Sequence, residues 1–357
     1  MNVLCINIKN TYNFNMRKIL QLLYGKKEMK EIFNMRKYLI GIDLGGTNIK
    51  SSIFTSNFEK VAEYRMSTQA EKGSEIVLLR ILESIQELFS ITNINASEIL
   101  CIGIGVPGLL DNKTGISKFS PNFPKWENVH VSEWFESKLR IPTFIDNDVR
   151  MNLYGEWYFG AGKGKRNVVL ITLGTGLGSG VIVDGKVLYG ATGSIGEIGH
   201  MNMYRSGREC RCGSSGCLGR YVSAIGILRT LREKMQDGEQ SVIYDWINGD
   251  YNKITAKMVS EAFDKGDAVA INTLHETGEV LGYALVNIIN LYNPECIIIG
   301  GGVSLAGERL LKSAREIVER KALQISKNAC EIVTSLLGDA SGILGAAIYA
   351  KNIIGDE

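Results

Sequence analysis

The sequence has few of the features that direct a protein to a membrane, to secretion or to nucleic acid. No run of about 18 apolar residues occurs among the 357 residues, so we expect no membrane-spanning helix and no membrane partner. Residues 1–34 lack the apolar core and cleavage site of a secretory signal. The net charge is only +2, and residues 1–35 carry a local +4. Residues 36–357 therefore sum to about −2, which disfavours nucleic acid as a partner.

Histidine is scarce, with three residues, and four of the seven cysteines are scattered. These four are Cys5, Cys101, Cys296 and Cys330. Cys101 and Cys296 lie in apolar, strand-like runs, where a thiol behaves as a small hydrophobic group. Thiols used in this way indicate a reducing compartment, so we expect a cytoplasmic protein.

One histidine and three cysteines lie within eighteen residues, at His200, Cys210, Cys212 and Cys217. Thiolates and a neutral imidazole suit zinc, and four such ligands complete a tetrahedral shell with no open position. The spacing therefore favours a structural zinc ion that fixes this loop. The alternative is an ordinary turn with reduced thiols, because the glycines of the same stretch are typical of turns.

Residues 1–35 differ from the rest of the chain. They are basic and rich in Asn, with one amphipathic stretch at residues 17–24. We interpret them as an N-terminal extension that is poorly ordered and that need not belong to the native protein. A remnant of a DNA-binding arm is the alternative.

A strand, a glycine turn and a second strand occur twice in the chain. Residues 38–55 show the pattern first, and residues 167–190 repeat it with an Asp-Gly hairpin signal. Two such starts predict two similar α/β lobes that share a cleft, at residues 36–150 and 151–339. Apolar periodicity predicts further helices at residues 75–90, 269–291, 308–321 and 341–353, and further strands at residues 100–106, 143–145 and 296–299.

Neither glycine turn fits a dinucleotide-binding or Walker pattern. The turn GTGLGSG lies between two strands with no helix directly after it, and no Gly-Lys-Ser/Thr follows any glycine run. Backbone N–H groups of such turns can converge on phosphates, and a carboxylate before the first turn could hold magnesium, directly or through water. The alternative is a pair of tight turns with positive φ and no ligand. The ATP-binding candidates are Asp43, Gly45, Gly46, Thr47 and Lys50 in the first turn, and Gly174, Thr175 and Gly176 in the second.

Five motifs follow one another along the chain. They are DLGGTNIK, the Asn147-Asp148 pair, GTGLGSG, Gly196-Glu197-x-x-His200 and Cys-x-Cys-Gly-x-x-Gly-Cys-Leu. Over residues 37 to about 350 they resemble the ROK family, which comprises bacterial sugar kinases, including ATP-dependent glucokinases, and sugar-responsive repressors. The resemblance implies a two-lobed, actin-like ATPase fold of the ribonuclease H-like type, with ATP in the interlobe cleft. It also implies that residues 340–357 pack back on the first lobe, and that the protein is a homodimer or homotetramer.

The resemblance assigns a catalytic role to Asp148. By likeness to the family, Asn147 and Asp148 bind sugar hydroxyls, and Asp148 is the general base. Phosphoryl transfer is mostly positioning and charge neutralisation, so one carboxylate on the attacking hydroxyl and magnesium on the phosphates suffice. Asp146 is the competing carboxylate, but strand alternation points it to the opposite face.

Further sugar contacts are implied by the same likeness. Glu197 and His200 resemble two of them, and His200 is implied as a zinc ligand through its other ring nitrogen. Gly108 resembles a contact made by the backbone. Asn122 resembles another, with a turn-forming Asn between two prolines as the open alternative. The segment Gly300-Gly301-Gly302 resembles the nucleotide-binding turn of the family.

Two positions depart from the kinases of the family. A glutamate that binds sugar hydroxyls usually follows Cys-Leu, whereas Gly219 stands here. Arg150 stands where the kinases more often have asparagine. A charge-assisted hydrogen bond to a buried hydroxyl is worth roughly 1.5 to 3 kcal/mol, so these departures weaken glucose as the specific substrate.

The sequence therefore favours an ATP- and Mg²⁺-dependent, glucokinase-like hexose kinase that phosphorylates the 6-hydroxyl of a sugar. A kinase for fructose, allose or an N-acetylhexosamine is an alternative. A sugar sensor or transcriptional regulator of the same family is another, although the residues before the first turn contain at most one convincing helix.

Overall fold

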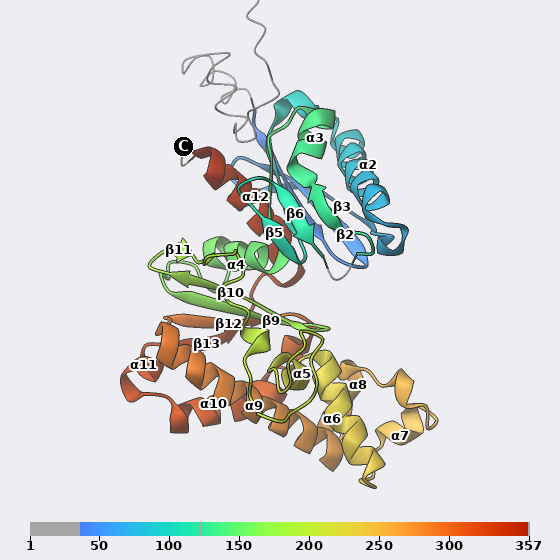
Figure 1. The fold of residues 1–357 in the computed structure, drawn as a ribbon, viewed down its shortest axis with the longest axis vertical. Helices are drawn as coiled ribbons and strands as arrows, with labels where there is room; N and C mark the ends of the chain where they lie inside the picture. The colour runs from blue at the N-terminus through green and yellow to red at the C-terminus, as the bar shows by residue number, and fades with distance from the viewer. Residues whose placement is uncertain (1–35, 121–122, 356–357) are drawn as a thin grey trace, which may run out of the picture. The chain divides into compact units, whose positions relative to one another are not determined.

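The chain divides into two units between Tyr154 and Gly155, inside helix α4 (Asp148–Phe159) (Figure 1). The computed structural model describes residues 36–120 and 123–355. The second unit comprises Gly155–Ser341, and the chain from Gly342 onwards belongs to the first unit. The N-terminal extension inferred above lies outside the described residues. Among those described, we find no helix with the length and apolar character that crossing a membrane requires.

The first unit is built on a five-stranded sheet in the order β3-β2-β1-β4-β8. Its first three strands form an antiparallel meander, and β4 and β8 then add in parallel to β1. A separate three-stranded sheet has the order β5-β6-β7. The strands are β1 (Tyr38–Leu44), β2 (Asn48–Thr55), β3 (Lys60–Ser67), β4 (Ile99–Val106), β5 (Leu109–Asp111), β6 (Ile116–Phe119), β7 (Glu127–His130) and β8 (Thr143–Asn147).

Helices cover both faces of the five-stranded sheet (Figure 1). Alternation along β1 sends Ile40 and Ile42 into a core with α2 (Ser74–Thr92) and α3 (Val131–Leu139). The other face packs against α12 (Ser341–Gly355). There Gly41 and Gly103 are required, because a Cβ atom at either would collide with a backbone carbonyl of α12.

The second unit repeats the topology of the first, with strand order β11-β10-β9-β12-β13. Again β9 and β10 form an antiparallel pair, and β12 and β13 add in parallel. The two lobes expected from the repeated strand-turn-strand pattern are therefore confirmed. The strands are β9 (Val168–Leu173), β10 (Leu177–Val183), β11 (Lys186–Val187), β12 (Cys296–Gly300) and β13 (Glu331–Thr334).

One large core fills the second unit, where α9 (Ala268–Tyr292) and α10 (Glu308–Lys321) pack against the sheet. The other α-helices of this unit are α5 (Gly219–Val222), α6 (Ala224–Gln236), α7 (Ile243–Trp246), α8 (Ala256–Asp264) and α11 (Gln324–Asn328). Short 3-10 helices occur at η2 (Ala70–Lys72) and η3 (Ala96–Glu98) in the first unit, and at η4 (Ile198–His200), η5 (Tyr251–Lys253), η6 (Gly302–Ala306) and η7 (Gly338–Ala340) in the second.

Candidate functional site

Asp148, the expected base, is partly buried where β8 passes into α4. Desolvation and, to a smaller extent, repulsion from Asp43 raise the pKa of its carboxyl to about 7, although the positive charge of Arg150 opposes the shift. Gly105 lets α4 approach the sheet closely, since a Cβ atom there would lie only 3.1 Å from Met151 Cγ, in the first half of α4. The first unit therefore brings the carboxyl groups of Asp43 and Asp148 close enough to interact electrostatically.

The Asn147 side chain holds the turn that carries Asp148. Its Oδ1 accepts hydrogen bonds from the backbone N–H groups of Val149 (3.0 Å) and Arg150 (3.3 Å), at the first turn of α4. Its Nδ2 donates to the carbonyl of Gly108 (3.2 Å). Gly108 has φ +100° and no room for a Cβ atom beside Phe119, so this position requires glycine. Three predicted sugar residues, Gly108, Asn147 and Asp148, thus form one corner.

Asp146 forms an ion pair with Arg150. Its carboxylate is fully buried and pairs with Arg150, 2.7 Å away, and it accepts the Asn147 N–H at 2.7 Å. This pairing accounts for Arg150, one of the two positions that departed from the expected pattern. Asp146 is the counter-ion of Arg150, which agrees with Asp148 as the carboxylate for catalysis.

The first glycine turn joins β1 to β2 and is fixed by hydrogen bonds to the N–H and the carbonyl of Gly45. Gly45 donates its N–H to the Asn48 carbonyl (3.0 Å), and the Thr68 hydroxyl donates to the Gly45 carbonyl (2.7 Å). Lys50 lies opposite Asp43 in the β1–β2 pair, so its positive charge borders the Asp43 carboxylate.

The second glycine turn joins β9 to β10 and leaves open space at two glycines. No described atom lies within 4 Å of a Cβ built on Gly174 or Gly176, beyond their own chain neighbours. Neither has positive φ, nor do Gly45, Gly46 and Gly178, so the alternative of turns that need positive φ is wrong. Neither crowding nor a positive φ therefore requires glycine at these two positions, and their backbones border open space.

The turn after β12 contains Gly300, Gly301 and Gly302. Gly301 has φ +81°, and a Cβ atom there would collide with the Leu173 backbone. Gly302 is surrounded by open space. The turn thus comes close to the end of β9, where the second glycine turn begins.

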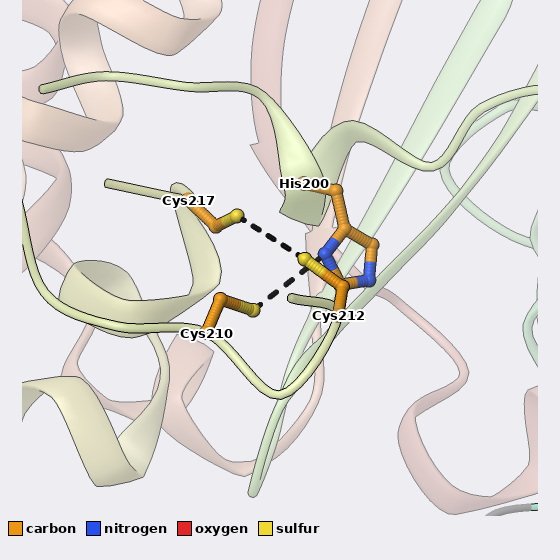
Figure 2. A group of neighbouring side chains, drawn as sticks. All are labelled: His200, Cys210, Cys212 and Cys217. Carbon is orange, nitrogen blue, oxygen red and sulfur yellow. Dashed lines mark hydrogen bonds between the residues drawn. The ribbon is translucent and has the colours of Figure 1, made fainter. Parts of the chain in front are cut away.

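The predicted metal cluster is assembled as expected (Figure 2). One ligand atom from each of His200, Cys210, Cys212 and Cys217 lies within 4.8 Å of all the others. The Cys210 sulfur is 3.8 Å from His200 Nδ1, and the Cys212 and Cys217 sulfurs are 3.7 Å apart. A hydrogen bond from the Ser214 backbone and the neighbouring thiols lower the pKa of Cys212 to about 7. This group could hold a metal ion, and its donor set is that of a structural zinc site.

Glu197 lies three residues before His200, at the start of η4, and both side chains are exposed. The segment is fixed by Ser179, whose hydroxyl donates to the Gly196 carbonyl and accepts the Ile198 N–H at 3.2 Å. Gly219 follows the cluster, and a Cβ atom there would make ordinary contacts with Gly199 O (3.4 Å) and Leu177 Cβ (3.5 Å). Gly219 is therefore not required by packing. Asn122 lies outside the described residues.

One residue of interest was not identified from the sequence. The carboxylate of Glu156 is fully buried and accepts hydrogen bonds from Ser335, Leu336 and Leu337. An acidic residue in a helix segment that is otherwise apolar and aromatic was the available signal.

The model of the ROK family matches residues 39–353. The chain belongs to the ROK family. It is 37% identical over 317 residues to a glucokinase of Thermotoga maritima, covering 89% of this chain and 98% of that one. It is 31% identical to a xylose repressor of Caldicellulosiruptor bescii, covering 86% of this chain and 76% of the repressor. A ROK-family glucokinase of Streptomyces griseus, solved with glucose and AMPPNP, superposes with a TM-score of 0.75 at 29% identity, over 88% of this chain and 99% of that one.

Proposed function

We propose that this ROK-family protein is a glucokinase that transfers the γ-phosphoryl group of ATP to the 6-hydroxyl of glucose. It is an ATP-dependent hexose kinase, like the two glucokinases named above. The observation that carries the proposal is Asp148, whose carboxyl has its pKa raised to about 7 beside a second carboxylate. A general base works best when its pKa is near the working pH.

Asp148 accepts the proton of the attacking hydroxyl. Asn147 orients Asp148 by capping α4 and is hydrogen-bonded to Gly108. Both residues are assigned to the sugar hydroxyls by likeness to the family. Because phosphoryl transfer requires little covalent chemistry from the protein, a positioned hydroxyl and a neutralised phosphate are sufficient.

The phosphates are assigned to the glycine turns. The N–H groups of Gly45, Gly46 and Thr47 in one turn, and of Gly174, Thr175 and Gly176 in the other, are the proposed donors to phosphate oxygens. Asp43 and the adjacent Lys50 fit a magnesium–nucleotide complex, since one supplies a carboxylate ligand and the other a positive charge. When bound, magnesium neutralises charge on the phosphates. The turn at residues 300–302 is assigned to the nucleoside.

The cluster of His200, Cys210, Cys212 and Cys217 is proposed to hold a structural zinc ion. Three sulfurs and one imidazole nitrogen within 4.8 Å of one another match a closed tetrahedral shell. The metal would orient the His200 ring so that its other nitrogen, together with Glu197, binds sugar hydroxyls. Zinc thiolates need reduced cysteines, which supports a cytoplasmic location. A homodimer or homotetramer remains a prediction from the family likeness.

A sugar-responsive role without catalysis is the second candidate. It is favoured by Gly219, which removes an expected sugar ligand, and by the likeness to a xylose repressor. The two candidates differ in turnover. We therefore propose to measure ATP consumption by the purified protein with magnesium and glucose, fructose, mannose, allose or N-acetylhexosamines. Turnover with glucose is expected, and sugar binding without turnover on any of them would favour the second candidate.

A further inference from the structure

Glu156 is a buried carboxylate that the chemistry above does not use. Glu156 lies in the second half of α4 and is fully buried. Its Oε1 accepts hydrogen bonds from Ser335 Oγ at 2.6 Å and from the Leu337 N–H at 2.8 Å. Its Oε2 accepts the N–H groups of Ala161 at 2.9 Å and Leu336 at 3.2 Å. Removing a carboxylate from water is costly, and these four donors offset that cost.

Three of the four donors belong to one short segment, residues 335–337, directly after β13. This segment has little other regular structure to hold it, because β13 ends at Thr334 and η7 starts at Gly338. Glu156 therefore fixes the segment through two consecutive backbone N–H groups and one hydroxyl. Gly160 allows this arrangement, since a Cβ atom there would collide with the Glu156 carboxylate.

The segment lies against the glycine turn that follows β12. Strands β12 and β13 are parallel neighbours, so both segments emerge from the same edge of the sheet. The Ser335 N–H donates to the Ile299 carbonyl at 2.9 Å, and a Cβ atom on Gly300 would lie 3.4 Å from Ser335 Cβ. By holding residues 335–337 in place, Glu156 therefore also fixes their position relative to the turn at residues 300–302, which is assigned to the nucleoside.

Residues 335–337 and η6, which begins in the glycine turn, each expose a leucine. Leu336 is 72% exposed, and Leu305, in η6 after the glycine turn, is 83% exposed. The Leu336 backbone is held by Glu156 while its side chain is left in solvent. Ligand sites are lined by apolar side chains with a few fixed polar groups beside them. The flat, largely apolar base of a nucleotide could therefore pack on the Leu336 side chain.

We propose that Glu156 is a positioning residue for ATP: it fixes residues 335–337 so that the Leu336 side chain lies against the nucleotide base, beside the turn at residues 300–302. The proposal rests on the kinase function inferred above. Glu156 touches neither the sugar nor the phosphates in this account, so its effect falls on nucleotide affinity.

The test compares two matched pairs of variants of the full chain. Glu156→Gln replaces acceptor oxygen with an amide NH₂ that faces backbone donors, and Glu295→Gln is its control. Glu295 accepts the Arg166 N–H (2.7 Å) and the Asn167 N–H (2.8 Å), before β12 rather than after it. Leu336→Ser is paired with Ile325→Ser, because Ile325 is 83% exposed and lies in α11, before β13.

Glu156→Gln is expected to raise KM for ATP by roughly tenfold or more, as loss of a positioning group does, while KM for glucose at saturating ATP stays unchanged. Calorimetric titration with AMPPNP should show the same loss of affinity. Leu336→Ser should weaken AMPPNP binding without lowering Tm, which covers the case in which Glu156→Gln fails to fold. The two control variants should bind AMPPNP like the unmodified protein, even if Glu295→Gln lowers Tm.

Normal AMPPNP affinity in folded Glu156→Gln, or in Leu336→Ser, would overturn the proposal. So would an equal rise of KM for ATP in Glu295→Gln, because the effect would then report general destabilisation. If the unmodified protein binds AMPPNP but phosphorylates no sugar, the kinase function fails while the AMPPNP titrations still decide the role of Glu156.

Discussion

The side chains of Asp146 and Arg150 form a buried ion pair with a separation of 2.7 Å, one turn apart at the junction of β8 and α4. Their side chains are 0% and 8% exposed. The same Asp146 Oδ1 accepts the Asn147 N–H, so the pair holds the backbone that carries Asn147 and Asp148. Arg150 is therefore occupied by an internal partner.

Breaking this pair should destabilise the fold. Arg150→Met leaves the Asp146 carboxylate buried without its counter-ion, and we expect a loss of about 3 to 5 kcal/mol in the free energy of unfolding. Urea denaturation measures it. The double variant Asp146→Asn with Arg150→Met should lose much less than the sum of the two single variants. Equal stability of Arg150→Met and the unmodified protein would show that the pair is unimportant.

The raised pKa of Asp148 predicts the pH dependence of the reaction. The base must be ionised to accept a proton, and the pKa of its carboxyl is about 7 in the free protein. The value of kcat/KM for the sugar should therefore rise roughly tenfold per pH unit below about pH 6 and level off above about pH 8. Initial rates across this range test it. A profile that stays flat down to about pH 5 would contradict Asp148 as a base with a raised pKa.

Zinc removal should affect stability and sugar affinity together. The pKa of Cys212 is lowered to about 7, so its thiolate is available for metal near neutral pH. We expect equimolar zinc by elemental analysis of the purified protein, and a lower Tm and a higher KM for glucose after chelation. Cys212→Ser should lose the zinc, whereas Cys330→Ser, outside the cluster, should keep it. Full activity without zinc would separate the cluster from the sugar site.

Gly219 offers a gain-of-function test. A Cβ atom at this position meets only ordinary contacts, and Gly219 starts α5 without positive φ, so Gly219→Glu should fold normally. If the position faces the sugar, the new carboxylate should lower KM for glucose by roughly tenfold, the value of one charge-assisted hydrogen bond. Gly219→Gln, which lacks the charge, should have a smaller effect. An unchanged KM in Gly219→Glu would remove residue 219 from the sugar site.

Local patterns were sufficient to predict the strand pairs that begin both sheets, four of the longer helices and the metal cluster, whereas β5 to β7, α3, α6 and α8 were not predicted. Strand-turn-strand repeats predicted both sheets, because each hydrophobic pattern is set within a few residues. The ligand cluster was equally predictable, since three cysteines and one histidine lie close in sequence. The boundary between the units was placed at residue 150, whereas the structure divides the chain after Tyr154, because α4 continues through the boundary.

Contacts between distant segments were not predictable from a single sequence. The hydrogen bonds of Glu156 to Ser335 and Leu337 join residues about half the chain apart, and no local pattern encodes them. The pairing of Asp146 with Arg150 is local, yet an arginine at that position was interpreted only as a departure. The φ values of the glycine turns also came only from the structure.

The central claim is that Asp148 is the base of an ATP-dependent glucose kinase. Asp148→Asn is the most direct test, because it keeps the side-chain shape and removes the ionised carboxylate. The variant should remain folded. The native pKa of about 7 lies above the ordinary 3.8, so Asp148 favours the native state at low pH and loses that contribution as pH rises through 7. Asparagine stays neutral, so the variant should be more stable than the unmodified protein above pH 7, by at most about 4 kcal/mol.

The decisive measurement is the rate at which glucose 6-phosphate forms from glucose and ATP, with magnesium, in the unmodified protein and in folded Asp148→Asn. We predict rapid formation by the unmodified protein and a decrease of roughly 10² to 10⁴ in kcat for the variant. Comparable kcat values in the two proteins, or no product from the unmodified protein, would contradict the account.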